Sequence, residues 1–200
     1  MVEPVRSVRG RAVPLDRSDV DTDQIIPAVW LKRIERTGFG AGLFAAWRED
    51  PSFVLNRPEY AGARILVAGP NFGSGSSREH AAWALEDYGF RAVVSSRFAD
   101  IFRNNALKIG LVPAEVPRDA ADALMRAVED DPALEVVVDV EQRRVTAPAA
   151  GIEAAFVLDD FTQWRLLNGL DDIGLTLRHE AAIEAFERQR SPLLPTVADG

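Results

Sequence analysis

Short apolar runs alternate with segments of helical periodicity across the middle of the chain. Residues 65–68 form an uninterrupted apolar run bounded by glycine and proline, which predicts a buried strand. The pattern then predicts a helix over 78–88, a strand over 92–94, a helix over 99–109 and a third strand that ends before Pro113. This order is typical of parallel strands with helices packed on the sheet.

The flanking regions predict further elements. An opening strand is expected over 1–13, ending at Pro14, and the glycines and prolines of 36–62 indicate loops around short helical pieces. An amphipathic helix is predicted over 117–130. The remaining predicted elements are antiparallel strands at 134–138 and 144–146, a last strand at 156–158, and helices at 161–168 and 172–188.

These elements predict one α/β domain with a mixed sheet. A chain of 200 residues is the ordinary length of a single domain. We expect that domain to span residues 1–190. The last ten residues, 191–200, contain two prolines and are expected to form a disordered tail.

Composition excludes several kinds of chemistry. The chain has no cysteine, so it holds no disulfide, thiolate nucleophile or cysteine-ligated cluster of its own. Its two histidines are far apart in sequence, which argues against a histidine-rich metal site. The net charge is −8, and the acidic excess lies entirely in residues 101–200. This disfavours nucleic-acid binding and places any anionic substrate on the neutral first half.

No apolar run approaches the roughly 20 residues that a membrane-spanning helix requires. The first residues also lack the apolar core of a signal peptide. We therefore expect a cytoplasmic protein.

The loop over 69–80, Gly-Pro-Asn-Phe-Gly-Ser-Gly-Ser-Ser-Arg-Glu-His, is the segment that best fits a binding site. It joins a predicted strand to a helix start, where unpaired backbone N–H groups and the helix dipole favour an anion. Arg78 adds a cation that grips a carboxylate with two hydrogen bonds. The loop has no lysine and does not match the glycine spacing of phosphate or dinucleotide loops, so a carboxylate is the expected anion.

Purely structural roles are the alternative for these residues. Ser76 and Glu79 have the spacing of a helix capping box, and His80 fits a partly buried structural position better than a catalytic pair with Ser76. The aspartates within 16–23 fit helix capping or pairing with arginine better than a calcium loop. The glycines within 28–42 predict a mobile lid.

Four motifs resemble a known family. They are residues 21–28, beginning Asp-Thr-Asp-Gln-Ile-Ile-Pro; 69–82, containing Gly-Ser-Ser-Arg; 96–106, beginning Ser-Arg-Phe-Ala-Asp; and 168–177, Asn-Gly-Leu-Asp-Asp-Ile-Gly-Leu-Thr-Leu. In this order they resemble the small subunits of 3-isopropylmalate dehydratase, in the swivel-domain branch of the aconitase superfamily. The resemblance covers about residues 9–187.

The resemblance implies a swivelling β/β/α domain with a mixed, partly barrel-like sheet and flanking helices. It implies a hydro-lyase active only as a heterodimer with a large subunit, which carries a [4Fe–4S] cluster. This chain would itself bind no cofactor and no metal. The reaction dehydrates 2-isopropylmalate to 2-isopropylmaleate and rehydrates it to 3-isopropylmalate, in leucine biosynthesis. The substrate is thus a small dicarboxylate.

The resemblance also implies roles for residues. Ser76 matches the family's catalytic serine, whose alkoxide removes a proton from the carbon beside a carboxylate. Ser77 and Arg78 match positions that bind the substrate carboxylate, and Asp23 matches an aspartate that supports the site. The following segment, with Leu31, Lys32 and Arg33, departs from the spacing of aconitases. It is expected to contact the substrate, with Leu31 at the isopropyl group and Lys32 or Arg33 at a carboxylate.

Two other functions stay open at this level. One is the small subunit of a related hydro-lyase, acting on citraconate or methylmalate. The other is a stand-alone carboxylate-binding module that never meets a cluster. A partner chain that binds iron and confers activity would separate the dehydratases from the module.

Overall fold

The computed structural model describes residues 2–32 and 37–189, and within them one mixed sheet organises the fold. The strands are β1 (Ser7–Leu15), β2 (Ile65–Ala68), β3 (Ala92–Ser95), β4 (Val112–Glu115), β5 (Glu135–Asp139), β6 (Arg144–Ala147) and β7 (Ile152–Ala155). Their spatial order is β4-β3-β2-β1-β5-β6-β7. The first four strands are mutually parallel, and β5, β6 and β7 join in antiparallel fashion. The predicted mixed sheet is confirmed.

Strand β1 joins the two halves of the sheet. Its residues 7–11 pair antiparallel with β5, and its residues 12–15 pair parallel with β2. Side chains of the first half alternate between exposed and buried, whereas all four of the second half are buried. The two halves of β1 differ in burial because their neighbours differ. Parallel strands are covered on both faces of the sheet, whereas antiparallel strands commonly face water on one face.

Two prolines lie inside strands, contrary to the prediction that strands end before them. Pro14 lies in β1, where Arg11 and Leu15 accept hydrogen bonds from the β2 side. Because alternate residues bond to one neighbour, Pro14 turns its missing N–H away from β2. Pro113 lies in β4, an outer strand of the sheet, where an absent N–H interrupts no ladder.

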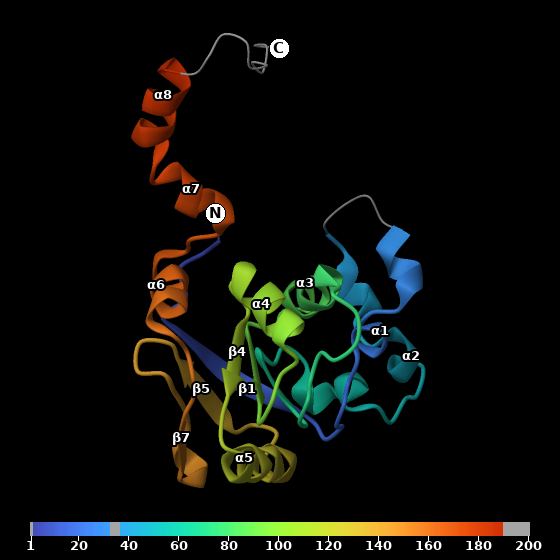
Figure 1. The fold of residues 1–200 in the computed structure, drawn as a ribbon. Coiled ribbons are helices and arrows are strands. Elements are labelled where there is room, and N and C mark those ends of the chain that lie inside the picture. The colour runs from blue at the N-terminus through green and yellow to red at the C-terminus, as the bar shows by residue number, and fades with distance from the viewer. Residues whose placement is uncertain (1, 33–36, 190–200) are drawn as a thin grey trace.

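Helices cover both faces of the parallel strands. Figure 1 shows α3 (Glu79–Tyr88) and α4 (Asp100–Lys108) together on one side, and α5 (Arg118–Asp130) on the other, against β1 and β2. The remaining helices are α1 (Thr22–Ile25), α2 (Ala45–Arg48), α6 (Asp160–Asn168), α7 (Asp172–Leu177), α8 (Glu180–Arg188) and the short 3-10 turns η1 (Ala28–Lys32), η2 (Phe39–Gly42), η3 (Val54–Asn56), η4 (Pro58–Tyr60) and η5 (Pro148–Ala150).

Two predicted elements near the end of the chain are wrong. The last strand is β7, not 156–158; Phe156 and Leu158 are buried, but as part of a connection rather than a strand. The single helix predicted over 172–188 is two helices, α7 and α8, which separate at Arg178 and His179. No proline or glycine marks this break, so the periodic pattern alone did not reveal it.

The segment 28–42 is partly packed against α3. Phe39 is buried and its ring lies 5.2 Å from that of His80, and the backbone N–H of Gly40 donates to Asp87 at 2.8 Å. The predicted mobility of segment 28–42 stays a prediction. The tail 191–200 lies outside the described residues, and the domain limits 1–190 stay a prediction.

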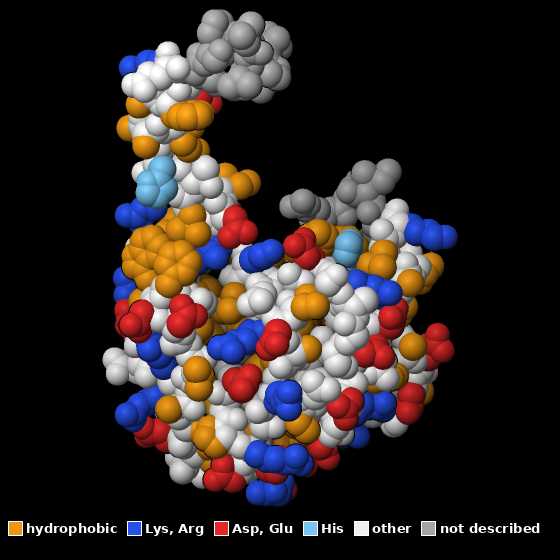
Figure 2. Space-filling view, in the orientation of Figure 1, with side chains coloured by type: hydrophobic (Ala, Val, Ile, Leu, Met, Phe, Trp, Pro, Cys, Tyr) orange, Lys and Arg blue, Asp and Glu red, His pale blue; other side chains and the backbone are white. Residues whose placement is uncertain are grey.

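The helices α7 and α8 form an arm, residues 172–188, that rises away from the sheet (Figure 1). No side chain of α8 is buried. Hydrophobic side chains gather on the arm and at its base (Figure 2), and the large exposed ones are Phe161, Ile173, Leu177, Ile183 and Phe186. A helix of nine residues is only marginally stable by itself and normally depends on tertiary packing. Because no side chain of α8 is buried, the described part of the chain gives this helix little such packing.

No helix within 2–32 and 37–189 combines the length and apolar character that crossing a bilayer requires. The cytoplasmic location stays a prediction.

The loop after β2 is packed directly on α4. Gly73 has φ of +80°, and a Cβ atom placed on it would lie 2.2 Å from Cγ of Phe102. The ring of Phe102 lies 5.2 Å from that of Phe72 in the same loop, and both residues are buried. Only glycine therefore lets the loop approach α4 this closely.

Replacing Gly73 with alanine should cost about 2–5 kcal/mol of unfolding free energy, because left-handed strain and overpacking add. Gly151 is the matched control, since its φ is +66° but no atom lies within 4 Å of the point that a Cβ would occupy. Gly151→Ala should therefore cost only the strain, about 1–2 kcal/mol. Chemical denaturation of both variants measures the difference, and equal losses would contradict the close contact with Phe102.

Candidate active site

The predicted site lies where parallel strands end. Because β1, β2 and β3 are parallel, their carboxyl ends meet at one edge of the sheet. The connections that leave this edge are residues 16–21, 69–78 and 96–99. Ligands of open α/β sheets commonly bind outside the carboxyl ends of strands. The chain order thus brings two of the motifs, the aspartate-rich segment and the Gly-Ser loop, side by side.

Backbone hydrogen bonds join these two connections. The N–H of Gly73 donates to the carbonyl of Val20 at 2.8 Å, and the N–H of Thr22 donates to the carbonyl of Ser74 at 2.9 Å. A parallel bridge between Asp21 and Ser74 continues the pairing beyond the regular strands. The position of one loop therefore fixes the other.

The connection after β3 holds the loop from its other side. The N–H of Phe72 donates to the carbonyl of Arg97 at 3.1 Å, and the hydroxyl of buried Ser95 donates to the carbonyl of Gly69 at 2.8 Å. Residues 69–74 are thus bonded on both sides, whereas 75–77 are exposed. The candidate catalytic residue lies on this exposed end.

Ser76 does not cap the helix. The N-cap residue of α3 is Arg78, and no side chain caps that helix, so the capping box predicted from Ser76 and Glu79 is wrong. The Ser76 hydroxyl instead lies 3.1 Å from the hydroxyl of Thr22, which also lies 3.2 Å from the Ser76 carbonyl. Exposed Ser76 therefore has a buried hydroxyl as its side-chain partner.

Arg78 and Asp23 form an ion pair through Nη1 and Oδ1. The Arg78 side chain is 22% exposed and that of Asp23 is 57% exposed, so water screens the attraction and the pair serves orientation more than stability. The short helix α1 that carries Asp23 is itself fixed by a capping box, in which Asp21 and Gln24 exchange two hydrogen bonds. The predicted capping and arginine-pairing roles are confirmed for Asp21 and Asp23.

The structure brings Asp23, Ser76 and Arg78 together, but it does not gather all of the predicted site residues around them. Ser77 is exposed on the same loop. Leu31 is half-buried and Lys32 exposed on η1, and within the described part of the chain no hydrogen bond or ion pair joins either to the loop. Arg33 lies outside the described residues.

His80 packs between aromatic rings. Its ring lies 4.6 Å from Trp83 and 5.2 Å from Phe39, which agrees with the partly buried structural role predicted for it. Burial lowers the pKa of His80, an effect that Glu79 opposes and Arg78 reinforces. The imidazole is therefore neutral at neutral pH.

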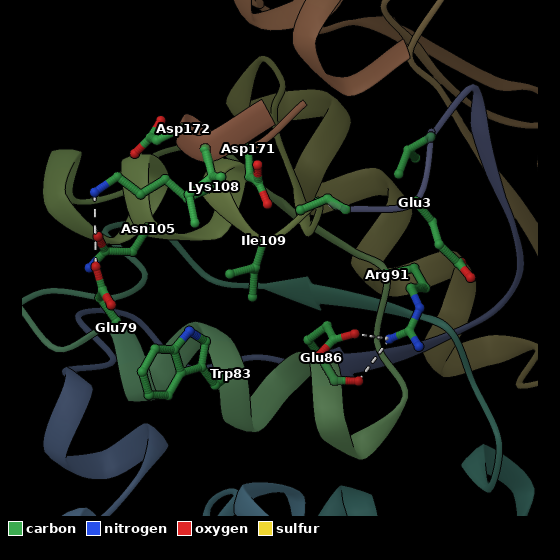
Figure 3. Close-up of a pocket in the computed structure, with 14 residues that line it drawn as sticks. Glu3, Glu79, Trp83, Glu86, Arg91, Asn105, Lys108, Ile109, Asp171 and Asp172 are labelled. Carbon is green, nitrogen blue, oxygen red and sulfur yellow. Dashed lines mark hydrogen bonds and ion pairs between the residues drawn. The ribbon is translucent and has the colours of Figure 1, made fainter. Parts of the chain in front are cut away.

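A hollow of about 690 Å³ lies beside the site, between α3, α4 and the start of α7 (Figure 3). It begins at Glu79, the residue after Arg78, and contains none of the predicted site residues. Its charged lining consists of five carboxylates and two cations: Glu3, Glu79, Glu86, Asp171 and Asp172, with Arg91 and Lys108. The acidic excess disfavours a dicarboxylate there.

The arrangement suits carboxylate binding next to a hydroxyl. Arg78 provides a planar cation, and the first N–H groups of α3 have no acceptor within that helix. Ser76 lies two residues before this helix end. In residues 2–32 and 37–189, no group of three or more histidine, aspartate or glutamate side chains is placed to hold a metal ion.

Thr22 is the residue that sequence reasoning missed. It is 1% exposed and is one of few buried polar residues among those described. The family resemblance assigns a supporting role to Asp23 and none to the threonine beside it. The threonine gave no local signal, since its contact with Ser76 spans 54 positions of the chain.

Two family models match parts of this chain. Residues 2–119 match the family model of the aconitase C-terminal domain, and residues 172–198 match that of the C-terminal domain of the 3-isopropylmalate dehydratase small subunit. The second match begins where the arm begins.

Two curated relatives and one solved structure extend this finding. The 3-isopropylmalate dehydratase small subunit of Parafrankia sp. is 68% identical over 94% of this chain and 96% of the relative. That of Streptomyces coelicolor is 61% identical over 93% of each chain. The crystal structure of 3-isopropylmalate dehydratase from Methanocaldococcus jannaschii matches with a TM-score of 0.67 at 27% identity, covering 90% of this chain and 99% of that one. The predicted fold class is thereby confirmed, and the chain belongs to the family of 3-isopropylmalate dehydratase small subunits.

Proposed function

We propose that this chain is the small subunit of a hydro-lyase that interconverts 2-isopropylmalate and 3-isopropylmalate through 2-isopropylmaleate, in leucine biosynthesis. The relatives named above are 3-isopropylmalate dehydratase small subunits over nearly their whole length. The observation that carries the proposal is the side-by-side placement of Ser76 and Arg78 with Asp23 at the carboxyl end of β2. A base and a carboxylate-binding cation are the two groups that this chemistry asks of the chain.

Arg78 orients the substrate in this proposal. Its guanidinium presents five N–H donors in a fixed fork, and Asp23 accepts from Nη1. Because the ion pair with Asp23 fixes the orientation of the guanidinium, its remaining N–H groups point in a defined direction, toward which a substrate carboxylate can bind. Ser77 and the N-terminal N–H groups of α3 complete the carboxylate site.

Ser76 accepts the proton in this proposal. In dehydration, the Ser76 alkoxide takes the proton from the carbon next to a carboxylate, and the C–H electron pair forms the double bond. The hydroxyl on the neighbouring carbon leaves as hydroxide, with the electron pair of its C–O bond. A serine hydroxyl is a poor base in water, so the site must stabilise the alkoxide by positioned donors and exclude solvent. Ser76 is exposed in the single chain, which makes a second chain necessary for the exclusion.

The second chain is a large subunit that carries the [4Fe–4S] cluster. This chain has no cysteine, so a cluster that binds the substrate hydroxyl and carboxylate would be held by cysteines of the partner. The arm supports a partner, because α8 has no buried side chain and its large apolar residues are exposed. When the partner closes, Leu31 then faces the isopropyl group of the substrate, and Lys32 or Arg33 faces a carboxylate.

Replacing Ser76 with alanine separates catalysis from folding. In the reconstituted complex, turnover should fall by roughly 10²–10⁴, the usual contribution of a positioned acid–base group. Unfolding free energy should change by less than about 0.5 kcal/mol, because Ser76 caps no helix. Steady-state kinetics and denaturation measure both.

Ser74→Ala is the control for this test, since it removes a hydroxyl from the same loop whose nearest acceptor is a carbonyl 3.4 Å away. Ser74→Ala should leave turnover within about threefold of the unmodified complex. A Ser76→Ala complex with near-normal turnover would refute the proposed base.

Arg78→Lys keeps the charge and removes the fork. KM for isopropylmalate should rise by about 10–100-fold, because a lysine replaces two directed hydrogen bonds with one. Arg144, which is paired with Glu153 on the far part of the sheet, provides the control, and Arg144→Lys should leave KM unchanged. An unchanged KM in Arg78→Lys would remove Arg78 from the carboxylate site.

The single chain should be colourless and inactive on isopropylmalate, and should become active only with its cluster-bearing partner.

Backbone amides of α8 should exchange with deuterium rapidly in the single chain, and their exchange should slow at least tenfold in the complex. Amides of α5, which packs on the sheet, should exchange alike in both. Activity of the single chain would overturn the two-subunit proposal, and unprotected α8 in an active complex would remove the arm from the interface.

A further inference from the structure

We infer that Thr22 is a positioning residue for Ser76, which holds the serine hydroxyl in place and donates a hydrogen bond to its alkoxide. The inference rests on the proposed function of Ser76. Thr22 is 1% exposed and its hydroxyl lies 3.1 Å from the Ser76 hydroxyl. The partner of the exposed candidate base is therefore a side chain whose own position is fixed by the core.

The position of Thr22 is determined by several bonds. It is the first residue of α1, whose N-terminus is locked by the capping box of Asp21 and Gln24. Its N–H donates to the Ser74 carbonyl at 2.9 Å, and its carbonyl accepts from Ile26 at 3.0 Å. Thr22 thus reaches Ser76 from a rigid backbone, and little entropy is lost when the hydroxyls meet.

The Thr22 hydroxyl has two acceptors within reach, and this allows both protonation states of Ser76. It lies 3.2 Å from the Ser76 carbonyl and 3.1 Å from the Ser76 hydroxyl oxygen. When Ser76 is protonated, Thr22 donates to the carbonyl and accepts from the serine O–H. When Ser76 is an alkoxide, rotation about the Thr22 C–O bond directs the same proton to the serine oxygen. A hydrogen bond to a charged oxygen is roughly twice as strong as a neutral one, so this contact favours the alkoxide.

The Ser76 carbonyl does not depend on Thr22. It also accepts from the N–H of Arg78 at 2.8 Å. Replacing Thr22 by valine, which has nearly the same shape, therefore removes the hydroxyl without leaving that carbonyl unpaired. This makes Thr22→Val a specific test of the hydroxyl rather than of the loop's structure.

In the reconstituted complex, Thr22→Val should lower kcat by about 10–100-fold, with KM changed by less than about threefold. Thr22→Ser, which restores the hydroxyl, should return kcat to within about threefold of the unmodified complex. Ser95→Ala is the matched control, because it removes another buried hydroxyl that holds the same loop, at Gly69, without contacting Ser76. Its kcat should stay within about threefold.

The combination with Ser76→Ala distinguishes this inference from the proposed function. If Thr22 acts through Ser76, adding Thr22→Val to Ser76→Ala should lower the residual rate no further, whereas independent effects would multiply. Normal kcat in Thr22→Val beside a large loss in Ser76→Ala would overturn the role of Thr22 alone. Normal turnover in Ser76→Ala would overturn the function of Ser76 itself. Failure of Thr22→Ser to restore kcat would show that shape, not the hydroxyl, matters at this position.

Discussion

The parallel pairing of β1 with β2 is the constraint on which the candidate site depends. Residues 12–15 pair in register with 65–68, so the two strands end together and their connections leave the sheet side by side. The pairing then continues through the bonds between Val20 and Gly73 and between Thr22 and Ser74. Thr22 and Asp23 on one connection consequently meet Ser76 and Arg78 on the other. A shift of register by one residue would separate both contacts at once.

The sequence predicted the parallel core well because its signals are local. Buried strands such as β2 and β3 are continuous apolar runs, and each following helix ends at a glycine. The predicted site residues Ser76 and Arg78 came from a motif within one loop. The resemblance implied that Asp23 supports the same site, but the sequence did not identify Arg78 as its partner, since residues 55 positions apart carry no local signal of contact.

The errors lie where tertiary context decides the structure. Pro14 is tolerated in β1 because its position without an N–H faces away from β2. Pro113 is tolerated because β4 lies at the edge of the sheet. Ser76 and Glu79 have capping-box spacing, but the helix begins later and the contact with Thr22 takes the Ser76 hydroxyl elsewhere. Phe156 and Leu158 resemble a strand because they are buried, yet the alternating and half-exposed β7 is the actual edge. In each case a distant segment, rather than the local pattern, sets the structure.

The distribution of order around the site explains why such a chain would work only in a complex. Residues 69–74 are bonded on both sides and packed on α4, while Gly75, Ser76 and Ser77 project into water from this fixed base. On the proposed role of Ser76, the single chain positions the hydroxyl but does not provide the dry surroundings that an alkoxide needs. The arm presents the converse situation, since α8 is helical although none of its side chains is buried by the described part of the chain. A partner that covered the exposed loop and the arm together would both exclude water from Ser76 and give α8 a packing surface.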